Sequence, residues 1–152
     1  MARIIVLDSG PLGEACRKRG HPDVERLTLW LQHAKANGAI VAIPEMADYE
    51  VRRGLFLSGA IEGIKRLDDL REEFGFYIPI STAAMRKAAE LWADARRKGI
   101  ATADDKAIDA DVILAAQALL FTGLTDELVV ATYNEGHLSR YVQAHHWDNI
   151  TP

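Results

Sequence analysis

The chain has 152 residues, of which 49% are hydrophobic and 26% are charged, and its formal net charge is −4. This length suits one domain with a substantial core, and the acidic balance argues against a broad basic field that would bind nucleic acid regardless of sequence. No apolar run reaches the roughly 20 residues of a membrane span, no signal peptide is evident, and a single cysteine excludes an intramolecular disulfide. We therefore expect a globular, cytoplasmic protein with no membrane contact.

The elements expected in the first half follow apolar runs and helical spacing in the sequence. They are a strand over 3–8, a short helical stretch to about 18, a helix over 24–36, a strand over 39–43, and helices over about 44–57 and over 61–74. Asp23 is expected to cap the helix over 24–36. Gly59 is expected to end the helix that Pro44 opens, because glycine tolerates the left-handed conformation that often follows a helix.

The second half predicts further strands and a strongly apolar helix. Its elements are a strand over 76–80, a helix over 82–98, a polar loop over 100–108, a helix from 111 to about 122, a strand over 127–131, a helix over about 135–144 and an edge strand over 147–150. Ser81 or Thr82 is expected to cap the helix over 82–98, with Met85 and Trp92 on its inward face. All three tryptophans are expected in the core, and Cys16 is expected to act as a small apolar residue.

Strands that alternate with helices predict an α/β fold. We expect a single domain over 1–152, with a mainly parallel, twisted sheet of four to five strands and helices on both faces. No linker, internal repeat or low-complexity segment marks a second domain. In such sheets the ligand site lies outside the carboxyl ends of the strands, so residues that follow strands are the first candidates for chemistry.

Three acidic residues from separate segments are expected to meet at that edge of the sheet. Asp8 closes the first strand, Glu50 lies in the helix after the second strand, and Asp111 opens the apolar helix. Two unit charges about 4 Å apart cost roughly 4 kcal/mol at an effective dielectric near 20. A hard divalent cation such as Mg²⁺ takes oxygen ligands and relieves this repulsion. The pattern therefore predicts a metal-dependent phosphodiesterase.

Four segments also resemble the PIN-domain ribonucleases, in particular their VapC-like toxin branch. They are VLDSGPL at 6–12, ADYEVRRGL at 47–55, IDADVILAA at 108–116 and VATYNEGHL at 130–138. The resemblance spans almost the whole chain. It implies a PIN-like fold and an endoribonuclease that uses Mg²⁺ or Mn²⁺, with Asp8, Glu50 and Asp111 as metal ligands and catalytic residues. It also implies an RNA substrate, an antitoxin protein as partner, and a homodimer.

The last two segments leave details of the metal site open. Asp109 and Asp111 point about 200° apart on a helix, so we expect Asp109 as the N-cap and Asp111 in the first turn, with Asp109 kept as a further candidate ligand. Asn134 stands where many PIN nucleases carry a fourth acid, and an amide adds no charge to hold a second ion. Asn134, Thr132 and Ser9 are expected to position water or backbone donors around the metal.

The remaining charged residues allow two interpretations. Arg52 and Arg53 follow Glu50 directly and are candidates for contacts with RNA phosphates, although a solvated helix face explains them equally well. Glu45 is expected to serve the helix dipole and Asp48 to be solvated. The five histidines show no helical ligand spacing for zinc. The alternative to a nuclease is a catalytically inactive PIN-like module that binds RNA or a protein, which the amide at Asn134 keeps open.

Overall fold

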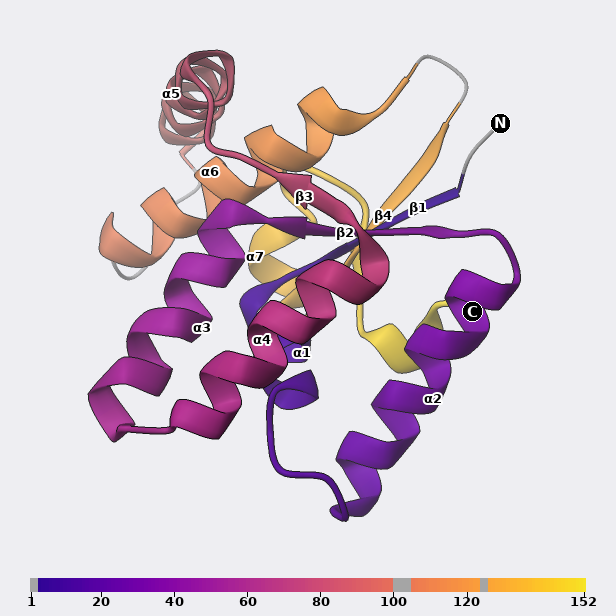
Figure 1. Ribbon diagram of the computed structural model, residues 1–152. Coiled ribbons are helices and arrows are strands. Elements are labelled where there is room, and N and C mark those ends of the chain that lie inside the picture. Colours follow the sequence, from indigo (N-terminus) through magenta and orange to yellow (C-terminus); the bar gives the residue numbers. More distant parts are fainter. Residues whose placement is uncertain (1–2, 100–104, 124–125) are drawn as a thin grey trace.

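The structure, a computed structural model, describes residues 3–99, 105–123 and 126–152, and a parallel sheet forms its centre (Figure 1). The strands among these residues are β1 (Arg3–Leu7), β2 (Ile40–Pro44), β3 (Phe76–Ile78), β4 (Glu127–Ala131) and β5 (Ala144–His145). They lie in the order β3-β2-β1-β4-β5, and every neighbouring pair is parallel. The predicted α/β fold with a parallel sheet is confirmed.

Helices cover both faces of this sheet. They are α1 (Ser9–Ala15), α2 (Pro22–Ala36), α3 (Glu45–Ser58), α4 (Ile61–Phe74), α5 (Thr82–Arg97), α6 (Asp105–Phe121), α7 (Glu135–Leu138) and the 3-10 helix η1 (Trp147–Asn149). Figure 1 shows α2 and α4 on one face and α5 and α6 on the other, with α3 standing beyond the ends of β1 and β2. No helix among the described residues is long and apolar enough to cross a bilayer.

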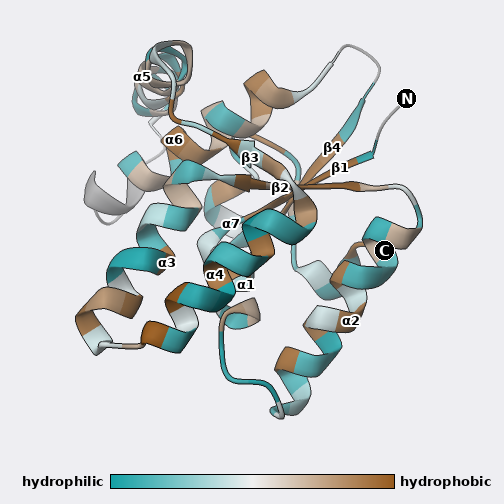
Figure 2. Ribbon diagram, in the orientation of Figure 1, coloured by the Kyte–Doolittle hydropathy of each residue, from teal (hydrophilic) through white to brown (hydrophobic). Residues whose placement is uncertain are grey.

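The core lies around β1, which pairs with a strand on each side. Its residues from Ile4 to Leu7 are at most 1% exposed, and Figure 2 shows hydrophobic strands at the centre beneath helices with hydrophilic outer faces. The chain order reverses between β1 and β4. Connections from these two strands therefore leave toward opposite faces, which opens a crevice at their carboxyl ends.

Several helix ends are as predicted. Gly59 ends α3 with a left-handed φ of 71°, and the Ser81 hydroxyl caps α5 by accepting the Ala84 N–H at 3.0 Å. The cap of α2 differs, because Asp23 lies inside the first turn. His21 is the N-cap instead, and its Nδ1 accepts the Asp23 N–H at 3.3 Å.

The C-terminal third departs most from prediction. Val130 N–H donates to the Gln143 carbonyl at 2.8 Å and Thr132 N–H to that of His145 at 3.0 Å. This pairing draws the segment 143–145 into the sheet as β5. Consequently α7 ends at Leu138 rather than near 144, and the strand expected over 147–150 is wrong, since η1 occupies most of that segment.

The start of α6 also differs from prediction. A polar loop was expected over 100–108. Residues 100–104 of that range lie outside the described residues, and α6 begins at Asp105. Asp109 is therefore not an N-cap, and Asp111 lies beyond the first turn. The inward face of α5 differs too: Met85 and Trp92 are 45% and 38% exposed, because alanines face the neighbouring helix α6.

The other two tryptophans and Cys16 are buried, as predicted. Trp30 and Trp147 are 7% and 5% exposed, and their rings lie 5.7 Å apart between centroids. Cys16 is 1% exposed, and burial raises the pKa of its thiol to about 12. A thiol in that state is protonated and unreactive, so Cys16 serves packing.

Candidate acidic active site

A cavity of about 590 Å³ opens at the carboxyl ends of β1 and β4, between α3 and α6. It is lined by Asp8, Ser9, Gly10, Met46, Glu50, Arg53, Asp109, Ala110, Asp111, Ile113, Tyr133 and Asn134. We call it the acid pocket. The three acidic residues singled out in the sequence come from three separate elements, and the fold brings all of them to this one pocket.

Asp8 is the most firmly held of the three. Its Oδ1 accepts the Ser9 N–H at 2.8 Å, which caps α1, and its Oδ2 accepts the Thr132 hydroxyl at 2.7 Å. Burial raises the pKa of this carboxyl, while the two hydrogen bonds oppose the rise. Thr132 is fully buried, so it acts on Asp8 rather than on a ligand in the pocket. Ser9 contributes its backbone N–H.

Glu50 reaches the pocket from the middle of α3. Burial raises its pKa first, and the charges of Asp8 and Asp111 raise it further. Arg53 lowers it, but the Arg53 guanidinium is 3.9 Å from the Glu50 carboxylate and the Arg53 side chain is 59% exposed. A solvated pair at this distance neutralises little of the charge.

Asp111 is the most perturbed carboxyl of the pocket. Burial is the main cause and the charge of Asp8 the next, and together they raise its pKa to about 6. His137 and Arg140 oppose this rise, and His137 Nδ1 lies 3.6 Å from Asp111 Oδ2. The sequence did not indicate this contact. The one hint in the sequence is that His137 lies in the last of the four motif segments, three residues after Asn134.

The three carboxylates are neighbours without forming a closed cage. Their mutual repulsion raises the pKa of Glu50 and of Asp111, yet among the described residues their oxygens do not all approach one another within 4.8 Å. An ion shared by all three therefore needs bridging water or a change of rotamer. Mg²⁺ suits the first arrangement, because it usually keeps several of its waters.

Asp109 and Asn134 line the same pocket at its rim. Asp109 is exposed and lies two residues from Asp111 on one helix, so the two carboxylates point in different directions. Asn134 is the N-cap residue of α7 but makes no side-chain cap bond, while its N–H donates to the Thr132 hydroxyl at 2.8 Å. Its side-chain amide oxygen is thus an uncharged acceptor, or metal ligand, at the pocket.

Arg52 does not reach the acid pocket, and the interpretation that it contacts RNA there loses its basis. Its Nε donates to Asp48 at 2.8 Å and its Nη2 to Asp68 at 2.8 Å, on the side of a second cavity. Asp48 was expected to be solvated, but it is 6% exposed because this ion pair buries it. Glu45, expected to serve only the helix dipole, accepts the Tyr77 hydroxyl and the Ile80 N–H.

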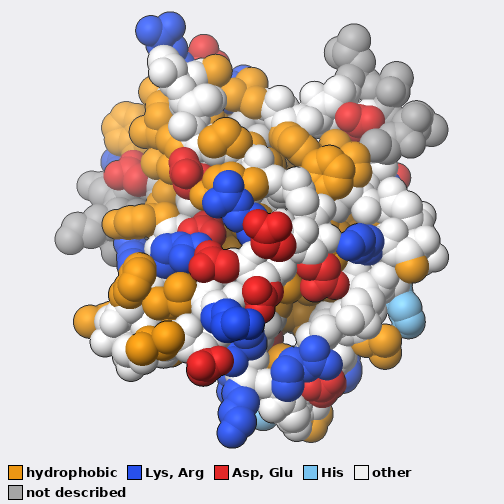
Figure 3. Space-filling model, viewed as in Figure 1, with side chains coloured by type: hydrophobic (Ala, Val, Ile, Leu, Met, Phe, Trp, Pro, Cys, Tyr) orange, Lys and Arg blue, Asp and Glu red, His pale blue; other side chains and the backbone are white. Residues whose placement is uncertain are grey.

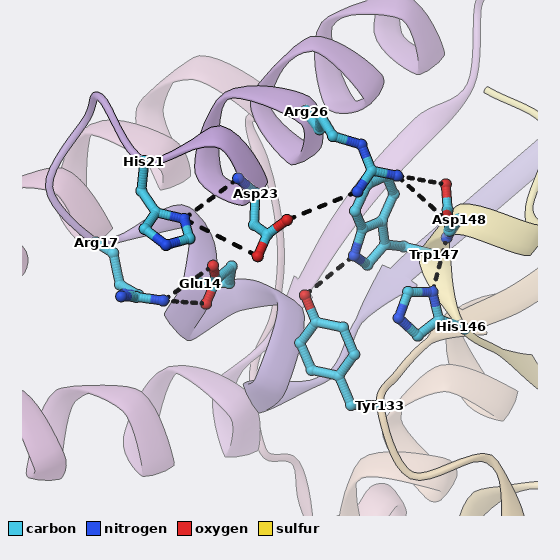
Figure 4. Close-up of polar contacts among 9 residues, drawn as sticks. All are labelled: Glu14, Arg17, His21, Asp23, Arg26, Tyr133, His146, Trp147 and Asp148. Atoms are coloured by element: carbon cyan, nitrogen blue, oxygen red, sulfur yellow. Dashed lines mark hydrogen bonds and ion pairs between the residues drawn. The ribbon is translucent and has the colours of Figure 1, made fainter.

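A different group of possible ligands lies outside the acid pocket. Ligand atoms of Glu14, His21 and Asp23 all lie within 4.8 Å of one another (Figure 4). Each already has a partner: Arg17 pairs with Glu14 at 3.1 Å, Arg26 lies 3.7 Å from Asp23, and His21 Nδ1 caps α2. These contacts account for the group without an ion.

Solved structures share this fold over nearly their whole length. A chain of VapBC2 from Rickettsia felis, crystallised with a DNA fragment from the promoter, gives a TM-score of 0.73 at 19% identity, covering 95% of this chain and 99% of that one. FitAcB from Neisseria gonorrhoeae gives 0.65 at 22% identity, with 96% and 99% covered. DNA-bound VapBC from Salmonella typhimurium gives 0.61 at 17% identity, with 97% and 99% covered.

These likenesses define the class of fold. No family model and no curated protein matches the sequence. The fold is nevertheless PIN-like, a single α/β domain with a parallel sheet, as the four motif segments predicted. The VapBC complexes bear the name of the toxin branch that the sequence resembles, so that resemblance is confirmed at the level of the fold.

Proposed function

We propose that this chain is a metal-dependent endoribonuclease, the toxin of a toxin–antitoxin pair. The observation that carries the proposal is the acid pocket. Asp8, Glu50 and Asp111 converge there, burial and the charge of Asp8 raise the pKa of Glu50 and of Asp111, and Arg53, which lines the pocket, is largely solvated. Burying several like charges is costly unless a cation joins them, so the arrangement favours a bound divalent ion.

The donor set fits Mg²⁺ or Mn²⁺. Carboxylate oxygens from Asp8, Glu50 and Asp111 would hold the ion directly or through water, and Asp109 and Asn134 offer further oxygens at the rim. When bound, such an ion lowers the pKa of a coordinated water and neutralises charge that builds on the scissile phosphate.

The three carboxyl groups would have distinct tasks. Asp8 is fixed by Ser9 and Thr132, so it orients its ligand. Asp111 or Asp8 would orient or deprotonate the attacking water, and in the metal-free pocket Asp111 is the carboxyl whose pKa is raised most, to about 6. Water as nucleophile leaves a 5′-phosphate and a 3′-hydroxyl on the RNA, whereas a metal-free mechanism through the 2′-hydroxyl would leave a cyclic phosphate.

The partners follow from the same comparison. Two of the similar structures are VapBC complexes, both with DNA bound. Their being toxin–antitoxin complexes supports an antitoxin protein as the partner of this chain. A homodimer and a cytoplasmic location belong to the same proposal. Asn134 favours the second candidate, an inactive PIN-like module that binds RNA or protein, because it removes the charge of a fourth acid from the pocket.

Cleavage of RNA discriminates between the two candidates. The purified chain, freed of any partner and stripped with EDTA, is incubated with total RNA, with and without Mg²⁺ or Mn²⁺, and the new ends are mapped. The nuclease proposal predicts metal-dependent cutting with 5′-phosphate ends that is lost in Asp8→Asn. If the folded protein binds RNA but does not cut it in either metal, the inactive module is supported. Cyclic phosphate ends would contradict the mechanism in which a metal activates water.

A further inference from the structure

One wall of the acid pocket is aromatic. Tyr133 follows Thr132 just beyond β4, lines the pocket, and remains 47% exposed. Single exposed aromatic side chains are common on protein surfaces. The case for Tyr133 therefore rests on its place in the wall of the acid pocket and on how its ring is held there.

The ring is held from behind by a set of aromatic residues (Figure 4). The Trp147 indole N–H donates to the Tyr133 hydroxyl at 3.0 Å, and the ring of His146 lies 5.0 Å from that of Tyr133 between centroids. Trp147 is 5% exposed, and it packs against His146, Trp30 and the guanidinium of Arg26. This support fixes the orientation of the Tyr133 ring before any ligand binds.

The absence of a side chain at Gly10 lets the Tyr133 ring lie against the first turn of α1. A Cβ built on Gly10 would lie 2.6 Å from Cδ2 of Tyr133, a distance that real Cβ contacts essentially never show. Glycine at this position therefore lets the ring approach the backbone two residues after Asp8. Any larger residue would push the ring away from the acids.

The Tyr133 hydroxyl is poorly placed for proton transfer. It already accepts the hydrogen bond from Trp147, and burial together with the charges of Glu14 and Asp23 raises its pKa. The phenol thus stays protonated at neutral pH. What Tyr133 offers to the pocket is the apolar surface of its ring.

We propose that the Tyr133 ring is a stacking platform for one unpaired nucleobase next to the scissile phosphate. The inference rests on the proposed nuclease function and adds to it a residue that contacts a base of the substrate. Every base has a π-face, so stacking on an aromatic side chain tolerates many sequences. Bases inside an A-form duplex already stack on their neighbours and cannot reach such a ring.

Abasic scanning of a single-stranded RNA tests this directly. Each oligonucleotide lacks one base near the cleavage site, and kcat/KM is measured in Mg²⁺ or Mn²⁺. For the wild-type protein, removal of the base at one flanking position should lower kcat/KM about tenfold. Tyr133→Leu should lower kcat/KM by the same factor on intact RNA and show no further loss on that abasic substrate. Tyr133→Phe, which keeps the ring, should stay within about threefold of wild type.

Control measurements distinguish failure of the stacking role from failure of the proposed nuclease function. Tyr133→Leu should retain the far-ultraviolet circular dichroism and the Mn²⁺ affinity of the wild type, and a duplex that pairs the cut site should be cleaved at least about tenfold more slowly. Wild-type protein that cuts no RNA would overturn the nuclease proposal itself. Cleavage in which Tyr133→Leu and the abasic substitution each have no effect, or have effects that multiply, would overturn the stacking role alone.

Discussion

Two of the cavities along α3, the acid pocket and the cavity around Arg52, use similar residues in opposite ways. In the acid pocket Glu50 faces Arg53 at 3.9 Å, and two further acids stand nearby. In the second cavity Arg52 binds Asp48 and Asp68, each at 2.8 Å. The second cavity pairs its charges, and Figure 3 shows basic and acidic side chains interleaved over α3 and α4 on this side.

This difference suggests that Arg52 with its two acids serves the stability of the fold, whereas the acid pocket is the candidate functional site. Arg52 joins α3 to α4, and its pKa is raised because both carboxylates stabilise its charged form. Among the described residues that line the acid pocket, no cation bonds two carboxylates in this way; burial and the charge of Asp8 raise the pKa of Glu50 and of Asp111, which therefore weaken the fold when ionised. Buried acids that destabilise the fold in this way are typical of functional sites, where a bound cation relieves their repulsion. Four variants test this contrast, from the largest expected effect to the smallest.

Asp8→Asn should abolish catalysis without unfolding the protein. Asparagine can still cap α1 through its amide oxygen, but it removes the charge that would hold the ion. We expect cleavage of RNA to fall by about 10³-fold or more, measured with a fluorescent oligonucleotide in Mg²⁺. A variant that keeps more than about a tenth of wild-type activity would remove Asp8 from the catalytic centre.

Asp111→Asn should stabilise the protein above pH 6. The pKa of Asp111 rises from 3.8 to about 6 on folding, so the folded state binds this proton more tightly than the unfolded state. The free energy of unfolding therefore falls as the pH rises from about 4 to about 6, by up to about 3 kcal/mol.

Urea denaturation at two pH values checks this sign. Asp111→Asn should exceed the wild type by up to about 3 kcal/mol at pH 7 and match it at about pH 3, where Asp111 is largely protonated in both states of the wild type. An equal difference at both pH values would mean that the substitution acts through packing rather than charge.

Asp48→Asn is the matched change in the second cavity, and its effect should be on stability alone. It leaves Arg52 with Asp68 of α4 as its remaining charged partner and weakens the ion pair within α3 in which Asp48 is buried. We expect the free energy of unfolding to fall by about 1–3 kcal/mol, measured by urea denaturation. Cleavage per folded molecule should equal that of the wild type. A large loss of kcat with stability intact would contradict the division between the cavities.

Arg53→Ala should have the smallest effect. Arg53 is exposed at the rim of the acid pocket, where it can meet a phosphate, so its loss should raise KM a few-fold and reduce the salt slope of RNA binding by about 1. Arg52→Ala is its control and should change the melting temperature but not KM. The reverse pattern would restore Arg52 as the RNA contact.

The sequence predicted those features that a single segment can determine. An acid after an apolar strand must lie at the sheet edge, so Asp8 could be placed, and the four motif segments brought Glu50 and Asp111 to the same edge. The contact of Arg52 with Asp68 could not be predicted, because Asp68 comes from another helix. The contact of His137 with Asp111 likewise depends on how α6 and α7 pack. Long-range packing, rather than local pattern, decided which charges were paired.

Binding of Mn²⁺ tests the central claim most directly. Isothermal titration of the EDTA-stripped protein would be compared among the wild type, Asp8→Asn and Asp48→Asn, with Glu14→Gln reporting on the group of Glu14, His21 and Asp23. The unneutralised acid pocket predicts binding by the wild type, Asp48→Asn and Glu14→Gln, and loss of that binding in Asp8→Asn. Binding that survives in Asp8→Asn but disappears in Glu14→Gln would place the ion outside the acid pocket and contradict this account.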